Sequence, residues 1–492
     1  MKQKLIENSL IYSGLQVLQK SVGLLLLPLY TRFLTADDYG VVAVINAVAA
    51  FLGVFYLLGL NSAAYRFYFD FKDDPDKLNE FWSTILTFLL ALALAFTCIM
   101  LWGGPYLLRP FLGSVSYYPY MLWGVIGAAF VPFNTIYQSL LQAQHNGRKY
   151  GLVYFSSFMV IVILTVIFVV ILKMRALGPV LAVSCASGIF FIYTFWDMRK
   201  QFKLGINLAY LKKGLLYSLP LVPNTLTGWS NGLLDRLLIN RFVSTAATGI
   251  YNVGYLFGGI QSFVNLAVNQ AYMPWFFEEM KIRRTDKIKK FFTVAMTLYI
   301  IAVLWVTVFA KEGLWILAKG DFRAGWKVVG LLSFGNYFVG YYYFLVNQLL
   351  FSEKGTRYVP LATVGAAVFG LLLNFILIRK YGMFGAAFTM LITNIATTCL
   401  IGWFAQRVEP IDWDHAYVIK LVIFNGLLCI ACYIAATADL TYWQEAAIKI
   451  GAVLAGTYLN YRLCRQKVGE LDLWRRLMAI VKIKFAGESL GT

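Results

Sequence analysis

An aspartate and an arginine stand next to each other in a chain that is otherwise rich in apolar residues. Asp235 and Arg236 lie in the stretch 220–241, and the segments on either side of it are hydrophobic. A charged side chain at bilayer depth costs roughly 2.5–3.5 kcal/mol on insertion scales, so it normally faces protein or water and marks a functional position. A carboxylate here could carry a proton or a sodium ion, and a guanidinium could bind an anionic group.

Asp235 also ends a polar stripe if this stretch is helical. At about 100° per residue, Asn224, Gly228, Asn231 and Asp235 fall within about 40° of one line along the helix. Arg236 points about 100° away from Asp235, and we therefore predict that it does not simply neutralise its neighbour and finds another partner. Two roles are open for Asp235: it carries a coupling proton or sodium ion, or it pairs with a basic residue on another helix.

The composition places these residues in a membrane protein. Of 492 residues, 60% are hydrophobic and only 14% are charged, and the mean hydropathy is +0.67. Such a chain is far more apolar than a soluble domain. The six cysteines lie in apolar runs or in a basic tail, so we expect neither disulfides nor a metal cluster. The chain offers no Ser-His-Asp set and no Gly-rich phosphate loop, so we predict no catalytic residue and no cofactor.

Apolar stretches between polar breaks predict about 14 transmembrane helices, since about 30 Å of hydrocarbon requires about 20 helical residues. The predicted protein is therefore all-α and polytopic. The segments are 9–33, 40–62, 82–108, 116–141, 151–172, 177–197, 214–242, 249–272, 290–310, 327–351, 358–378, 382–405, 415–437 and 445–463.

The basic residues predict the orientation. Lys and Arg gather in alternate connections, chiefly 199–213 and 281–290, and in the C-terminal tail. Because cytoplasmic loops carry the excess of basic residues, both termini are predicted to be cytoplasmic, and the connection 311–326 is a basic exception on the outer side. Basic loops against an anionic inner leaflet account for most of the net charge of +19 without any nucleic-acid partner.

The chain also repeats itself at a shift of 209 residues. This shift pairs Arg32 with Arg241 and Gly40 with Gly249. Residues 1–205 and 206–408 are therefore predicted to be two six-helix bundles, followed by two further transmembrane helices at 409–465 and a basic cytoplasmic tail at 466–492. Because six is even, the bundles are parallel repeats, which in transporters rock around a cavity at their interface.

Polar side chains that lipid would reject are the candidates for lining this cavity. The set contains a lysine in the middle of the first helix, the charged and amide residues of 220–241, and amides of other predicted helices. Its members are Gln16, Lys20, Asn134, Gln138, Asn224, Asn231, Arg236, Asn265, Asn269 and Gln348, with Asp235 as the possible ion-coupling residue. The alternative for each amide is an interhelical hydrogen bond, worth about 0.6 kcal/mol.

Several motifs resemble the polysaccharide transporter family of the multidrug/oligosaccharidyl-lipid/polysaccharide exporter superfamily. They are Leu27-Pro28-Leu29-Tyr30-Thr31-Arg32-Phe33-Leu34, Asp38-Tyr39-Gly40, Ser218-Leu219-Pro220-Leu221-Val222-Pro223-Asn224, Asp235-Arg236 and Gly249-Ile250-Tyr251-Asn252-Val253. The resemblance covers nearly the whole chain. It implies a flippase in the bacterial inner membrane that moves polyprenyl-diphosphate-linked oligosaccharide to the outer leaflet, beside a polymerase and glycosyltransferases. The family's cationic cavity would place Lys20 and Arg236 at the diphosphate.

Two other functions are compatible with a chain of this class. A multidrug exporter of the same superfamily would share the architecture but typically has twelve helices. An integral-membrane glycosyltransferase or polymerase generally needs a sizeable outer loop with catalytic carboxylates or histidines. His145 and His415 are the chain's two histidines, and both are predicted on the inner side. The sequence therefore favours a carrier over an enzyme.

Overall fold

The computed structural model describes residues 22–199, 202–438 and 440–469. Within these ranges the regular secondary structure is helical. Gln16 and Lys20, most of the predicted span 9–33 and nearly all of the predicted tail 466–492 lie outside the described residues. By their contacts, the described residues form two compact units: unit 1 holds those up to Asn252 together with 318–322 and 374–383, and unit 2 holds the rest.

Unit 1 is built around α7 (Leu122–Ala143), which packs against α3 (Ala36–Leu57), α4 (Leu60–Phe71), α5 (Pro75–Leu107) and α9 (Leu177–Met198). The other helices of this unit surround that bundle. They are α2 (Leu27–Phe33), α6 (Arg109–Leu112), α8 (Gly147–Thr165), α10 (Leu208–Ser218) and α11 (Val222–Phe242), with π-helical turns at Tyr117–Met121 and Val166–Ile171.

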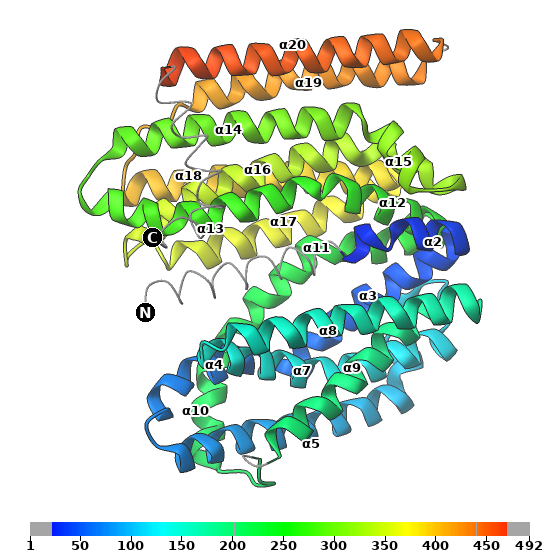
Figure 1. Cartoon of the computed structure of the whole chain (residues 1–492), viewed down its shortest axis with the longest axis vertical. Coiled ribbons are helices and arrows are strands. Elements are labelled where there is room, and N and C mark those ends of the chain that lie inside the picture. Colours follow the sequence, from blue (N-terminus) through cyan, green and yellow to red (C-terminus); the bar gives the residue numbers. More distant parts are fainter. Residues whose placement is uncertain (1–21, 200–201, 439, 470–492) are drawn as a thin grey trace, which may run out of the picture. The chain divides into compact units, whose positions relative to one another are not determined.

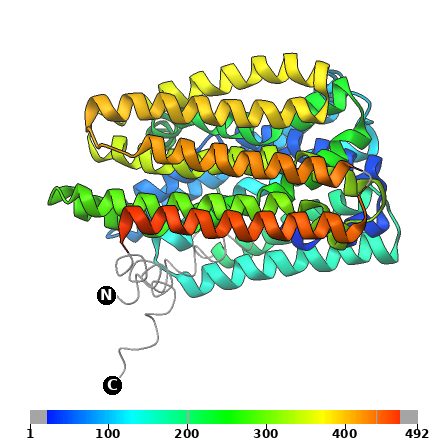
Figure 2. The same cartoon turned by 90° about the horizontal axis from the view of Figure 1, so that it is seen from above.

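Unit 2 is organised around α14 (Thr285–Val308), which packs against α13 (Ile260–Lys281), α16 (Trp326–Phe351), α19 (His415–Thr437) and α20 (Tyr442–Val468). An aromatic core at these contacts includes Tyr272, Phe292, Phe344 and Trp413. The last two helices, α19 and α20, lie side by side (Figures 1 and 2). The remaining elements are α15 (Ala310–Leu317), a 3-10 turn at Gly320–Gly325, α17 (Tyr358–Tyr381) and α18 (Met383–Val408), of which residues 320–322, 374–381 and 383 belong to unit 1.

Several predicted spans are interrupted. The segment 40–62 passes from α3 to α4 through a turn at Leu58-Gly59. The segment 214–242 contains the end of α10, a 3-10 turn at Leu219–Leu221 and then α11. Pro220 lies in that turn and has no N–H for a helical hydrogen bond. The segment 249–272 divides between α12 (Thr245–Gly258) and α13 at Gly258-Gly259, a pair with low helix propensity. Apart from such breaks, the residues of the predicted segments from 40–62 onward are largely helical in the structure.

The chain is an all-α multi-pass membrane protein. Within the described ranges, 10 helical segments are long and apolar enough to cross a bilayer. The predicted spans at 214–242, 249–272 and 445–463 are helical but are not among these 10. The helices α11 and α13 carry many of the candidate polar residues, which lowers their hydropathy.

The helices that contain the repeat-related glycines approach each other closely inside unit 1, near their first turns. A Cβ on Gly40 of α3 would lie 1.9 Å from the carbonyl oxygen of Thr245, and a Cβ on Gly249 of α12 would lie 2.2 Å from that of Ala36. Only glycine permits backbones to approach this closely. The division at 205/206 stays a prediction about the repeat, whereas in the structure α10 and α11 pack with helices of the first predicted bundle.

Candidate functional site

Asp235 and Arg236 form a buried ion pair on α11. The Arg236 Nη1 lies 2.8 Å from Asp235 Oδ1, and the side chains of Arg236 and Asp235 are only 3% and 10% exposed. The backbone N–H of Arg236 donates to the same carboxylate oxygen over 2.9 Å. The prediction that Arg236 does not neutralise its neighbour is therefore wrong. The helix places the Cβ atoms of Asp235 and Arg236 about 100° apart around its axis. The long arginine side chain nevertheless reaches back to the carboxylate of the preceding residue.

Two residues of α12 complete this polar cluster. Tyr251 donates its hydroxyl hydrogen to Asp235 Oδ2. The Nε of Arg236 donates to Asn252 Oδ1 over 3.1 Å, and its Nη1 also donates to the carbonyl oxygen of Gly232. Burial of charge is tolerated where the remaining hydrogen-bonding groups are satisfied. Sequence analysis did not select Tyr251 and Asn252 as site residues, although the motif 249–253 contains both.

The amino-terminal half of α11 presents an exposed polar face. Asn224, Gly228 and Asn231 are exposed, and a Cβ on Gly228 would contact nothing within 4 Å. On the other side of the helix, Trp229 donates its Nε1 hydrogen to the carbonyl oxygen of Ala47 over 2.8 Å. The predicted stripe is thus exposed along most of its length and ends at the buried Asp235.

The carboxyl end of α11 is tied to the connection after α5. Asn240 donates to the carbonyl oxygen of Leu112 over 2.7 Å, and its Oδ1 accepts from the Thr245 hydroxyl over 2.8 Å. The hydroxyls of Ser114 and Thr245 are 2.8 Å apart. Asn240 is buried, and sequence analysis did not select it. These bonds hold α11 next to the crossing of α3 and α12.

The candidate amides of unit 2 take part in bonds between its elements. Asn265 donates to the carbonyl oxygen of Asn336 over 2.7 Å, and Asn347 donates to Asn269 Oδ1 over 2.8 Å, so both join α13 to α16. Gln348 is buried, and its Oε1 accepts from the Trp413 Nε1 over 2.7 Å. The bonds of Asn265 and Asn269 are interhelical, whereas Gln348 binds a residue of the loop between α18 and α19. A cavity role for these three residues stays a prediction.

The candidate amides of α7 are half-buried in unit 1. Asn134 donates to the carbonyl oxygen of Ser187 on α9 over 3.3 Å, while its Oδ1 is buried without a partner within the described structure. Gln138 follows one turn later on the same helix and is also half-buried. A cavity role for both stays a prediction, as it does for Gln16 and Lys20, which lie outside the described residues.

The arrangement offers hydrogen-bonding groups to a polar ligand. The described residues contain no group of three or more His, Cys, Asp or Glu side chains that could hold a metal ion. The Nε and Nη1 hydrogens of Arg236 are donated to a side-chain amide, a carbonyl and a carboxylate, so an anionic ligand that binds either of these two nitrogens would have to displace an acceptor. Exposed amides on α11 can meet hydroxyl-rich ligands by hydrogen bonds without fixed stereochemistry.

Comparison with known proteins gives a consistent picture. A family model described as "Polysaccharide biosynthesis protein" matches residues 5–280. The "Lsg locus putative protein 1" of Haemophilus influenzae is 22% identical over 370 residues, covering 73% of this chain and 84% of that protein. The "Capsular polysaccharide biosynthesis protein CapF" of Staphylococcus aureus is 23% identical over 241 residues, covering 46% of this chain and 59% of that protein.

Solved structures share the fold. The lipid II flippase MurJ in an inward closed conformation superposes with a TM-score of 0.69 at 14% identity, covering 93% of this chain and 99% of that chain. An inward-facing multidrug resistance MATE family transporter of the MOP superfamily superposes with a TM-score of 0.58 at 15% identity, covering 79% of this chain and 94% of that chain. The chain therefore has the fold of these membrane transporters.

Proposed function

Since the chain belongs to the polysaccharide biosynthesis protein family, we propose that it is a flippase for polyprenyl-diphosphate-linked oligosaccharide repeat units. It would move these units from the inner to the outer leaflet by alternating access, for the synthesis of a cell-surface polysaccharide. It acts as a carrier and not as an enzyme. The transporter fold and the family membership support this class of function.

The exposed polar face of α11 carries the proposal. With 21 residues, α11 is about 31 Å long at about 1.5 Å per residue, enough to cross the hydrocarbon. Asn224 and Asn231 are exposed on it, and amides cost free energy wherever they face lipid without a hydrogen-bonding partner. This face therefore requires a wet passage, which is what a diphosphate-sugar head group needs to cross a bilayer while its lipid tail stays in hydrocarbon.

The close crossing of α3 and α12 at Gly40 and Gly249 supports alternating access. On the orientation predicted from the basic residues, this crossing lies at the outer side, with both termini in the cytoplasm and the protein in the bacterial inner membrane. Hydrogen bonds between Asn240 and both Leu112 and Thr245 stabilise the packing of the helices beside this crossing. Separation of this contact would open the passage outward. Polymerase and glycosyltransferases that make and use the repeat unit are the partners that such a carrier requires.

The proposal is tested by filling the passage at Gly228. This glycine has open space around its Cβ direction, so a tryptophan there would occupy the space in front of the polar face. Gly228→Trp should lower the rate of flipping of a fluorescent polyprenyl-diphosphate oligosaccharide in proteoliposomes by at least about tenfold, which corresponds to about 1.4 kcal/mol of barrier. Leaflet exposure of the sugar is read with a membrane-impermeant lectin or quencher.

Gly365→Trp is the matched control. Gly365 is also exposed, and a Cβ there would likewise contact nothing within 4 Å, but it lies on α17, an apolar membrane span. This variant should flip the substrate at the wild-type rate. Wild-type flipping by Gly228→Trp as well would show that the face of α11 is not the passage.

A multidrug exporter is the second candidate, because the fold is also that of a MATE transporter. The two functions differ in substrate. Transport of a lipophilic cation against its gradient by the same proteoliposomes, without flipping of the glycolipid, would favour the exporter. Release of pyrophosphate or free sugar would instead indicate an enzyme.

A further inference from the structure

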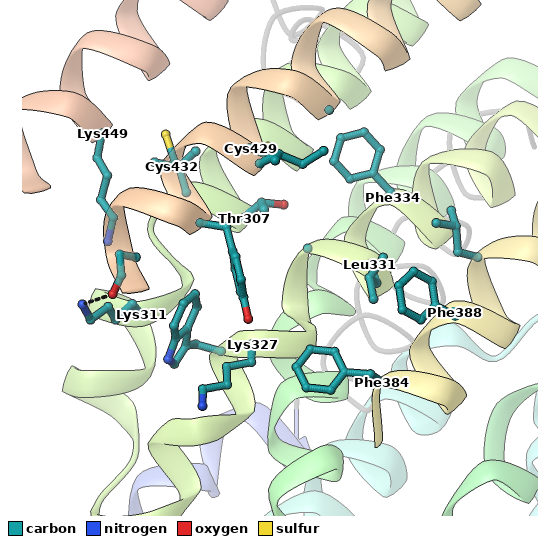
Figure 3. Close-up of a pocket in the computed structure, with 18 of the residues that line it drawn as sticks. Thr307, Lys311, Lys327, Leu331, Phe334, Phe384, Phe388, Cys429, Cys432 and Lys449 are labelled. Carbon is teal, nitrogen blue, oxygen red and sulfur yellow. Dashed lines mark hydrogen bonds between the residues drawn. The ribbon is translucent and has the colours of Figure 1, made fainter. Parts of the chain in front are cut away.

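An apolar pocket lies inside unit 2 between α16, α18 and α19. Its volume is about 500 Å³, within the range of about 300–1,000 Å³ that is typical of ligand sites. Figure 3 shows the rings of Phe334, Phe384 and Phe388 on one side of this pocket and three lysines, Lys311, Lys327 and Lys449, toward the other.

The pocket opens onto the surface of the protein beside α18 and α19. Phe388 on α18 and Ile430 on α19 line the pocket and are 40% and 57% exposed. Both helices are apolar membrane spans, so exposed side chains on them face hydrocarbon. A ligand of this pocket therefore enters from the bilayer and is itself lipophilic.

Two of the three lysines are neutralised by glutamates. The Nζ of Lys311 lies 2.8 Å from Glu445, and the Nζ of the buried Lys449 lies 2.5 Å from Glu312 and 2.6 Å from Glu445. The four side chains sum to zero formal charge and fasten α15 to α20. They offer no net attraction to an anion.

Lys327 is the remaining cation of the pocket. It is exposed, and it has no ion-pair or hydrogen-bond partner in the described part of the chain. Its neighbour Trp326 contacts Tyr433 of α19, with ring centroids 5.1 Å apart. Tryptophan and tyrosine are enriched at the membrane–water interface, where lipid head groups lie. An unpaired ammonium at this depth next to an apolar pocket is complementary to an anionic lipid.

We propose that the pocket binds an anionic glycerophospholipid, with an acyl chain among Phe334, Phe384 and Phe388 and the phosphate at Lys327. The apolar walls supply affinity for the chain, and the lysine supplies preference for negative charge. On the orientation proposed above, Lys327 lies at the outer side, so the lipid comes from the outer leaflet. The site is separate from the polar face of α11 and does not depend on the substrate of the protein.

The charge preference is tested by native mass spectrometry of the full-length protein released from nanodiscs that contain phosphatidylglycerol and phosphatidylcholine. Wild-type protein should retain phosphatidylglycerol. Lys327→Gln should retain it about fivefold more weakly, the change that about 1 kcal/mol per lysine near a membrane surface gives. Lys319→Gln removes another exposed lysine, one that does not line the pocket, and it should behave as wild type.

The position of the acyl chain of the lipid is tested by filling the pocket. Gly426 lines the pocket, and a Cβ there would contact nothing within 4 Å, so Gly426→Phe should abolish retention of the lipid. Gly451→Phe places the same side chain at an equally open glycine of α20 outside the pocket, and retention should persist.

Three outcomes would overturn the proposal. They are equal retention of phosphatidylglycerol and phosphatidylcholine by the wild-type protein, equal loss of lipid in Lys327→Gln and Lys319→Gln, and retention of a polyprenyl lipid in place of the phospholipid when both are supplied. The last result would assign the pocket to the tail of the transported substrate. None of the outcomes alters the flipping assay with Gly228→Trp, so the two proposals can fail independently.

Discussion

Replacement of Asp235 by asparagine separates a structural role from an ion-coupling role. The carboxylate lies 2.8 Å from the Arg236 guanidinium, and both side chains are almost fully buried. At an effective dielectric constant of about 20, charges this close attract by about 6 kcal/mol, and loss of one partner of a buried pair typically costs about 3–5 kcal/mol. Arg236 keeps its acceptors on Gly232 and Asn252, so we expect a cost of about 3 kcal/mol for Asp235→Asn.

A second ion pair provides the matched control. Lys149 and Asp197 are also 2.8 Å apart, and the Asp197 carboxylate likewise accepts from a tyrosine hydroxyl, that of Tyr137. Their side chains are 37% and 23% exposed, so water screens the pair. Asp197→Asn should therefore cost no more than about 1 kcal/mol.

The assay is the free energy of unfolding in mixed micelles, titrated with denaturing detergent, together with flipping in proteoliposomes under proton or sodium gradients. Asp235→Asn should lose stability, and the double variant Asp235→Asn/Arg236→Gln should recover much of it because no buried charge is left unpaired. Wild-type stability of Asp235→Asn, combined with flipping that no longer responds to a gradient, would refute the structural role and assign Asp235 to ion coupling.

Two further predictions concern the helix crossing and the start of α19. Gly40→Ala should destabilise the protein by about 1–3 kcal/mol, because its Cβ would overlap the backbone of α12. Gly53→Ala on the same helix has open space and should stabilise it by up to about 1 kcal/mol, so equal effects of the two on thermal unfolding would contradict the close crossing. Partial burial alone would raise the pKa of Asp414, but hydrogen bonds from Lys467 and from the backbone N–H of Tyr417 hold this pKa below 3.8. The stabilisation by Asp414 is therefore present above pH 3.8 and lost as the pH falls through the lower folded-state pKa. The stability difference between wild type and Asp414→Ala should stay constant from about pH 7 to about pH 5 and shrink in more acidic solution; a difference that grows on acidification would contradict this assignment.

Local properties of the sequence were sufficient to predict the class of protein and most of its helices. Apolar length sets whether a segment can cross a bilayer, and this is a sum over neighbouring residues. The predicted segments at 358–378 and 415–437 accordingly coincide with α17 and α19 to within a few residues. The helices break at Pro220 and at Gly258-Gly259, residue types that disfavour helix. The sequence analysis nevertheless predicted one continuous span across each of these positions.

The partners of the polar residues depended on tertiary structure. Sequence spacing gives the direction in which a side chain leaves its helix, not which helix stands opposite, because packing brings together residues far apart in the chain. Asn265 and Gln348 were therefore selected as candidate cavity residues from their polarity alone, and only the structure placed them in bonds with Asn336 and Trp413. For Asp235, the sequence determined that a charge lies within a predicted transmembrane segment. Only the fold decided that it is held by its own neighbour Arg236 and by Tyr251 of the next helix, since side-chain flexibility and the approach of α12 set that contact.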